Sequence, residues 1–386
     1  MIVDLHAHYP MHLAYEGDEF QKPRNRTLEA IRQLRKGRHG FGEWLDAFIL
    51  DIASRIANYR SWDAGPAVTV DNLVQGGVNV ALSVLYQPFD EMDLEHFEEA
   101  PKAAYFDDLL GQIESVEHEI KEKHSARAMV AHNNTELSHA LDEKKLVLVH
   151  AVEGGFHLGN DPSTIAANVC ELADRGVAYI TVAHLFWRHV ASNAPALPFL
   201  PDVWYRRLFT EPDVGLTDLG VALVEAMTKN HILVDVTHMT EAAMCDTFDL
   251  LPPDVPVIAS HMACRFGSLA YNLTDRIIRK IVRRGGLLGV ILCDHFCNEG
   301  HAQTKELAQS FDAICRQIDH IQGLVHSCDN IAIGTDLDGF IKPTLAGLES
   351  ASHLNLLEAM IRGRYPTDAE KICGGNALRL LREYWR

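Results

Sequence analysis

Several features that define whole classes of protein are missing from this chain of 386 residues. No apolar run approaches the roughly 18 residues of a membrane-spanning helix, so we expect no membrane insertion. No stripe of Lys and Arg is present, and the formal net charge is −18, which argues against a nucleic-acid partner. Internal repeats and low-complexity tracts are also lacking. What is present is a globular composition, with 47% hydrophobic and 23% charged residues.

Cysteine is sparse, with eight residues at irregular spacings. Such spacings do not build a disulfide framework, so reduced thiols are expected. Cys293 and Cys297 flank a histidine, but a structural zinc knuckle needs four ligands and no second Cys pair exists. The first apolar run begins at Met1 and leaves no room for a signal peptide. We therefore expect a cytoplasmic protein.

Short runs rich in β-branched residues alternate with longer amphipathic runs. The predicted strands are 2–5, 78–85, 146–152, 178–183, 232–236, 256–260, 287–292 and 330–334, with an extra strand at 127–131. The predicted helices between them include 163–175, 217–230, 240–250, 274–284 and 304–323. This alternation predicts an α/β fold with a parallel sheet, a single (β/α)8 TIM barrel over residues 1–386.

Two segments are longer than barrel connections need to be. We interpret 9–66 and 87–126 as insertions, with helices near 42–59 and 104–123. The loop at 185–214, rich in Pro and Trp, follows a predicted strand. Long loops at that end of a barrel are expected to form the wall of an active site.

Metal-ligand residue types follow the predicted strands at their C-terminal ends. These residues are His6, His8, Glu153, His184, His238, His261 and Asp336. His6 and His8 are spaced i, i+2 on one strand and therefore point the same way. Ligands at the ends of several strands are the layout of a barrel active site. Imidazoles with carboxylates suit borderline divalent ions, zinc first.

A carboxylate can bridge two ions, and Glu153 is followed by Gly154 and Gly155, which permit close approach. Two ions ~3.5–4 Å apart would acidify a bridging water. Asp336 could take the proton of that water, and His184 could hold the carbonyl oxygen as charge develops.

Each of these residues also has a structural interpretation when taken alone. Glu153 could cap a turn and Asp336 could form an Asx turn. The set is more specific than its members because every member follows an apolar strand. The neighbouring histidines His150, His157 and His189 are expected to be structural.

Six short motifs occur in a fixed order. They are Asp-x-His-x-His-x-Pro at 4–10, Val-Glu-Gly-Gly at 152–155, Thr-x-x-His at 181–184, Asp-x-x-His at 235–238, Ser-His at 260–261 and Gly-x-Asp-x-Asp-Gly at 334–339. In this order the chain resembles the membrane (renal) dipeptidase family of the amidohydrolase superfamily, from residue 2 to about 345.

The resemblance implies a binuclear zinc barrel that cleaves the amide bond of dipeptides by a metal-bridging hydroxide, with an L- or D-residue at the C-terminal position. It implies two Zn²⁺ per chain: one held by His6, His8 and Asp336, one by His238 and His261, with Glu153 as the bridge. His184 would lie over the small-molecule substrate, and a homodimer is compatible with this assignment.

Two positions depart from the family pattern. His8 stands where the family usually has Asp. The family also carries a carboxylate-binding Arg about eleven residues after the His that corresponds to His261, and Asn272 stands there. Arg265 is the nearest substitute and Arg276 the next. The departure leaves three hypotheses: a dipeptidase, an amidohydrolase acting on an N-acyl amino acid, lactam or lactone, and a metal-binding scaffold without turnover.

Overall fold

The computed structural model describes residues 1–15, 66–87, 91, 101–102, 104–198, 200–339 and 343–385. The helix predicted near 42–59 lies outside these residues, as does most of the insertion at 9–66.

Parallel strands form the centre of the molecule. Within the described residues they are β1 (Ile2–Ala7), β2 (Val78–Leu85), β3 (Ala128–Val130), β4 (Leu146–Glu153), β5 (Tyr179–Thr181), β6 (Leu233–Asp235), β7 (Val257–Met262), β8 (Leu288–Val290) and β9 (Ile331–Ile333). Their order is β2-β1-β9-β8-β7-β6-β5-β4, and β2 also pairs with β4. This pairing closes eight parallel strands into a TIM barrel, which confirms the predicted fold class.

The extra strand β3 lies outside the closed ring. It pairs with the start of β4, with Ala128 opposite Leu146. The Leu148 carbonyl accepts the Ala131 amide and the His150 carbonyl accepts the Ala178 amide, so β3 and β5 share one edge of β4. Strand β3 is therefore an addition to the barrel and not one of the eight strands that close it, in agreement with the extra strand predicted at 127–131.

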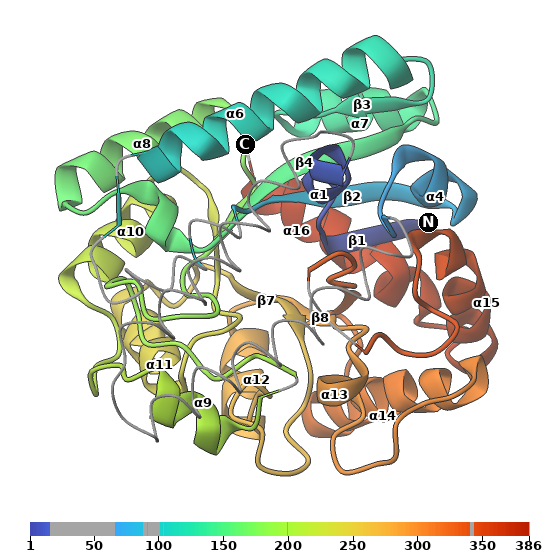
Figure 1. Cartoon of the computed structure of the whole chain (residues 1–386). Coiled ribbons are helices and arrows are strands. Elements are labelled where there is room, and N and C mark those ends of the chain that lie inside the picture. Colours follow the sequence, from blue (N-terminus) through green and yellow to red (C-terminus); the bar gives the residue numbers. More distant parts are fainter. Residues whose placement is uncertain are drawn as a thin grey trace, which may run out of the picture.

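Helices surround the strands (Figure 1). They are α1 (Pro10–Tyr15), α4 (Val70–Gln75), α6 (Ala104–Glu119), α7 (Asn134–Asp142), α8 (Pro162–Asp174), α9 (Asp202–Leu208), α10 (Asp218–Lys229), α11 (Glu241–Leu250), α12 (Asp275–Arg283), α13 (Asp294–Cys297), α14 (Leu307–Val325), α15 (Leu354–Arg364) and α16 (Asn376–Tyr384). Short helical turns are η2 (Ile120–His124), η3 (Gly155–Leu158), η4 (Ala351–His353) and η5 (Lys371–Gly375). Side-chain caps begin several helices, as where the Thr217 hydroxyl accepts the Gly220 amide.

Two apolar cores hold the barrel together. The larger one lies between the strands and the surrounding helices. The second fills the barrel itself, where Val3, Val80 and Val149 pack with Leu381 and Trp385 at the C-terminus of the chain. The interior is therefore packed with side chains, as in other TIM barrels. The polar residues that follow the strands, such as Glu153 after the apolar run of β4, lie at the C-terminal edge of the barrel.

Among the described residues, no helix combines the length and the apolar character that crossing a bilayer requires.

Candidate metal centre

Glu153 ends β4 at the centre of a cluster of imidazoles. Its side chain is 1% exposed. Its Oε1 atom lies 3.3 Å from His6 Nε2 and 3.5 Å from Nε2 of both His238 and His261. Its Oε2 atom lies 3.3 Å from Nε2 of His8 and 3.3 Å from Nε2 of His184. The barrel thus brings strand-end residues from far apart in the sequence onto one carboxylate.

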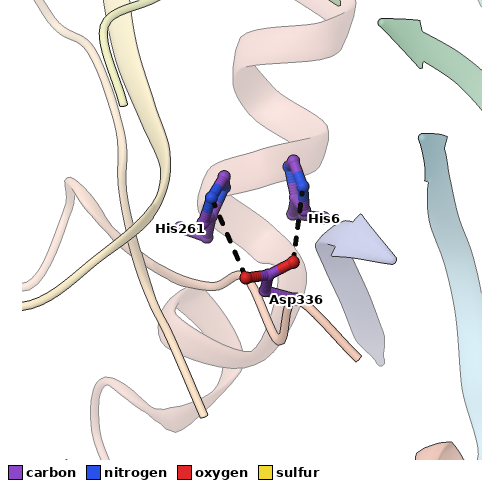
Figure 2. A group of neighbouring side chains, drawn as sticks. All are labelled: His6, His261 and Asp336. Carbon is purple, nitrogen blue, oxygen red and sulfur yellow. Dashed lines mark ion pairs between the residues drawn. The ribbon is translucent and has the colours of Figure 1, made fainter. Parts of the chain in front are cut away.

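Asp336 supplies a second carboxylate from the loop that follows β9. Its Oδ1 atom lies 3.2 Å from His8 Nε2 and 3.8 Å from His6 Nε2, and its Oδ2 atom lies 4.0 Å from His261 Nε2. Figure 2 shows the imidazoles of His6 and His261 facing the two oxygens of Asp336. All seven strand-end residues singled out from the sequence therefore meet in one place.

Hydrogen bonds on the far side of two imidazoles define which nitrogen carries the proton. The Tyr179 hydroxyl donates to the Leu5 carbonyl, so it accepts from His6 Nδ1 at 2.7 Å. The Ser260 hydroxyl donates to Asp235, so it accepts from His261 Nδ1 at 2.9 Å. When Nδ1 carries the single ring hydrogen, the Nε2 atoms of His6 and His261 present lone pairs to the cluster.

Lone pairs in such close contact need a cation between them. His6 Nε2 lies 3.2 Å from His8 Nε2, and His238 Nε2 lies 2.9 Å from His261 Nε2. Two imidazoles that bind one zinc ion at ~2.0–2.1 Å have nitrogens about 3 Å apart, which matches these contacts. The buried Glu153 Oε1 atom also has no hydrogen-bond donor. The donor set therefore fits a divalent metal.

Among the residues that the structure describes, three overlapping groups have ligand atoms close enough to share an ion. They are His6, His261 and Asp336; His6, His8 and Glu153; and Glu153, His238 and His261. Glu153 belongs to two of these groups, as a bridging carboxylate would.

The close packing of carboxylates and imidazoles shifts the pKa values of residues in the cluster. Burial would raise the pKa of Glu153, but the facing imidazoles, His184 first, hold it well below its usual value. Burial would lower the pKa of His8, but hydrogen bonds to Asp336 and Glu153 raise it to about 10. An ion that binds through His8 must therefore displace a proton.

Two buried carboxylates hold the strand ends from below. Asp4 accepts the amide of His6 and both the amide and hydroxyl of Thr335, and burial raises its pKa to about 6. Asp235 accepts the amide and hydroxyl of Ser260, next to His261. The backbone positions of the proposed ligands are thus fixed by hydrogen bonds rather than by loop packing alone.

The backbone at the centre includes unusual conformations. His238 and Asp336 have φ angles of 68° and 56°, in the left-handed region that non-glycine residues seldom occupy. A Cβ atom at Gly339 would lie 1.8 Å from Asp336 Oδ1 and 2.6 Å from His8 Nε2. Glycine at 339 therefore keeps space for the side chains of the centre.

One residue of the centre was not predicted from the sequence. Glu91 is buried and its Oε2 atom lies 2.5 Å from His184 Nδ1. It belongs to an acidic stretch of the insertion at 87–126, and nothing in its local sequence separates it from the other acidic residues there. Only the tertiary contact with His184 identifies it.

The remaining histidines that flank the ligands lie apart from the cluster contacts. His150 points out of the barrel toward Glu117, 3.6 Å away. His157 stacks on Phe156, and the His189 ring lies 5.5 Å from the Trp187 ring.

Arg265 occupies the loop after β7. Its Nε atom donates to the Asn272 carbonyl at 2.9 Å and its Nη2 atom donates to the Ala270 carbonyl at 2.7 Å. Asn272, at the position of the family arginine, is buried and donates to Glu299 and to the Phe296 carbonyl. Both residues thus stabilise this loop through the hydrogen bonds that they make.

Comparisons with known proteins agree with this geometry. A sequence model of the family "Membrane dipeptidase (Peptidase family M19)" matches residues 1–385. The chain is 27% identical to dipeptidase tcpJ of Claviceps purpurea (strain 20.1), over 83% of this chain and 70% of that protein. It is 26% identical to dipeptidase 3 of Mus musculus, over 84% of this chain and 59% of that protein.

Solved structures show the same fold. One is dipeptidase AC, a metallopeptidase of family M19, with a TM-score of 0.68 and 19% identity over 87% of this chain and 95% of that chain. Another is a Rhodobacter sphaeroides metallopeptidase liganded with a phosphinate mimic of the dipeptide L-Ala-D-Ala, with a TM-score of 0.67 and 19% identity over 88% of this chain and 97% of that chain.

A barrel with a buried cluster of ligand-type side chains at its strand ends is the arrangement of a metal-dependent hydrolase. The chain belongs to the membrane dipeptidase family, peptidase family M19, and is by class a metal-dependent dipeptidase.

Proposed function

We propose that the protein hydrolyses dipeptides with two zinc ions, accepting an L- or D-residue at the C-terminal position. The observation that carries the proposal is Glu153, which belongs to two candidate ligand groups, one with His6 and His8 and one with His238 and His261. His6, His8 and Asp336 would hold one ion, His238 and His261 the other, and Glu153 would bridge them. When bound, the ions would acidify a shared water and polarise the scissile carbonyl.

The chain's own residues would move the protons of the reaction. Asp336, whose oxygens line the same centre, would take the proton of the attacking water. His184 Nε2 faces the cluster. Burial would lower the pKa of His184, but the carboxylates of Glu153 and Glu91 raise it above its usual value, which favours hydrogen on both ring nitrogens. With Nδ1 bonded to Glu91, Nε2 would then donate a hydrogen bond to the carbonyl oxygen as negative charge develops there. The same Asp336 would return its proton to the leaving amine.

A second candidate is an amidohydrolase that acts on an N-acyl amino acid, a lactam or a lactone. It is favoured by the region around Asn272, because the family's carboxylate-binding arginine is replaced there by a buried amide. Arg265 stays the proposed partner of a substrate carboxylate. To bind it, the guanidinium would use donors other than those held by the carbonyls of Ala270 and Asn272.

Metal analysis combined with a substrate panel tests both candidates. We expect close to two equivalents of zinc, and turnover of L,L- and L,D-dipeptides above that of N-acyl amino acids, lactams and lactones. Arg265→Ala should raise KM for free dipeptides more than for their amides, because only the former lose a charge partner. Turnover of N-acyl amino acids, lactams or lactones without turnover of dipeptides would replace the dipeptidase by the second candidate, and a protein without metal or activity would support the hypothesis of a scaffold without turnover.

A further inference from the structure

Glu91 links two loops at the mouth of the barrel. It follows β2 in the sequence, whereas His184 follows β5, 93 residues later. The Glu91 side chain is fully buried, and the hydrogen bonds of its carboxylate go to Tyr86, His184, Leu185 and Phe186, none of which is a proposed metal ligand. Glu91 can therefore affect the metal centre through its hydrogen bond to His184.

Four hydrogen-bond donors converge on the Glu91 carboxylate. Oε2 accepts from the Tyr86 hydroxyl at 2.6 Å and from His184 Nδ1 at 2.5 Å. Oε1 accepts from the amides of Leu185 and Phe186 at 2.8 and 3.1 Å. An ionised carboxylate only accepts, so the hydrogen between Glu91 and His184 belongs to Nδ1. Burial would raise the pKa of Glu91, but the interactions with His184 and Tyr86 hold it below its usual value.

These contacts fix both the direction and the plane of the imidazole. With Nδ1 bound to Glu91, Nε2 points at Glu153, 3.3 Å away. The Tyr86 and His238 rings meet the His184 ring edge-on, with centroids 4.6 and 4.5 Å away. The Leu185 and Phe186 amides tie the backbone that carries His184 to the same carboxylate.

We propose that Glu91 is a positioning residue: its carboxylate accepts the hydrogen on Nδ1 of His184 and so directs the Nε2 atom of that ring into the metal centre. The role in turnover rests on the proposed function, because His184 acts there on the substrate carbonyl. The role in orienting the ring does not depend on the substrate.

Glu91→Gln tests the orientation directly. A glutamine whose oxygen accepts from the two amides turns its NH₂ group toward His184, and that group cannot accept a hydrogen bond from Nδ1. We expect the ring ¹⁵N spectrum of His184, assigned by its loss in His184→Ala, to show protonated Nδ1 in the wild type and a changed Nδ1 signal in Glu91→Gln. An unchanged signal would overturn the proposal whatever the substrate proves to be.

Kinetics then test whether Glu91 acts through His184. We expect Glu91→Gln to retain the zinc content and to lower kcat about 10²-fold with a smaller effect on KM. In the His184→Ala background the same change should have little further effect, because the residue being positioned is gone. An equal additional loss in that background would mean that Glu91 is merely structural.

Two further variants separate positioning from stability. Gln112→Ala loosens the same loop, since Gln112 binds the amide and carbonyl of Tyr86, yet it leaves Glu91 and His184 paired. It should keep the wild-type Nδ1 signal and kcat. Glu91→Asp retains an acceptor-only carboxylate, so it should keep Nδ1 protonated and restore most of the rate; this variant also decides the question if Glu91→Gln does not fold. The positioning role would be rejected if Gln112→Ala lowered kcat as much as Glu91→Gln does, or if Glu91→Asp did not restore kcat.

Discussion

Asp336 and His184 both line the centre, but they contact it differently. Asp336 lies within reach of three histidines and belongs to one of the candidate ligand groups, whereas His184 belongs to none of them. His184→Ala should therefore keep its zinc and lose about 10²–10³-fold in kcat, the usual cost of removing one transition-state donor. Asp336→Ala should lose zinc as well as rate. Elemental analysis and steady-state kinetics on the two purified variants measure both effects.

Wild-type turnover in His184→Ala would show that this histidine is structural. Zinc retained in full by Asp336→Ala would remove Asp336 from the proposed ligands and leave it only the role of base. Glu117→Gln is a matched control, because Glu117 is an acidic partner of a histidine on the outer side of the barrel.

His8 should make the zinc affinity of the centre depend on pH more strongly than an aspartate at the same position would. The pKa of His8 is raised to about 10 in the metal-free protein, so at pH 7 it carries a proton. An ion that binds His8 must release that proton, and zinc affinity should rise about tenfold per pH unit toward pH 10 from this group. His8→Asp should bind zinc with about one proton fewer released at pH 7. Calorimetry in buffers of different ionisation enthalpy counts the protons.

Equal proton release by His8→Asp and the wild type would show that His8 is not a ligand. Zinc affinity should rise with pH because the ion and the proton compete for His8. A group with a raised pKa holds its proton more firmly, and the ion gains affinity as that proton is lost.

Close contact between strands β7 and β9 gives a prediction about stability. A Cβ atom at Gly334 would lie 1.8 Å from the Ser260 carbonyl oxygen. Gly334→Ala must therefore push apart two strands that carry Ser260, His261 and the loop of Asp336. We expect a loss of about 1–3 kcal/mol in the free energy of unfolding, together with weaker zinc binding. Denaturant unfolding of the metal-free and zinc-loaded protein measures the two contributions.

Gly323 provides the matched comparison. It lies in α14, and a Cβ atom there meets nothing within 4 Å. Gly323→Ala should stabilise the protein by about 0.5–1 kcal/mol, because alanine loses less conformational entropy in a helix. A similar response at both positions would contradict the close contact at Gly334.

Elements with a strong local signal were predictable from the sequence. The eight predicted barrel strands and the extra strand at 127–131 all occur, because a strand buried on both faces is a continuous apolar run. Strand ends were less predictable. The strand predicted at 178–183 spans only Tyr179–Thr181 in the structure, because its pairing with β4 and β6 stops at Thr181.

The site was predictable to the extent that its residues follow strands. His6, Glu153, His238 and the other strand-end residues meet because the barrel sets their positions. Glu91 was not predictable, because its partner lies 93 residues away and no periodicity marks it. The contacts of Arg265 also depend on the path of its own loop, which the sequence does not specify.

The two ends of the barrel have separate tasks. The C-terminal helix α16 packs its residues Leu380 and Leu381 with the barrel interior, next to Val3 and Ala332, while the strand ends at the opposite edge carry the metal centre. Leu381→Ala should therefore cost about 2–5 kcal/mol of stability through a cavity, with kcat per folded molecule unchanged. Thermal unfolding and activity normalised to zinc content test this separation. A parallel fall in kcat and stability would show that the two ends are coupled.

The seam between β1 and β9 joins the beginning of the chain to residues more than 300 positions later. Asp4 pairs with Ile333, Ala7 bridges to Leu337, and the Asp336 amide donates to the His6 carbonyl at 2.8 Å. During synthesis on the ribosome, His6 and His8 emerge long before Asp336 exists. Strand β1 can therefore pair with β9 only after more than 300 further residues have been made. The candidate ligand group of His6, His261 and Asp336 depends on the same long-range closure, so a metal site that uses all three should form late in folding and not on the nascent first strand.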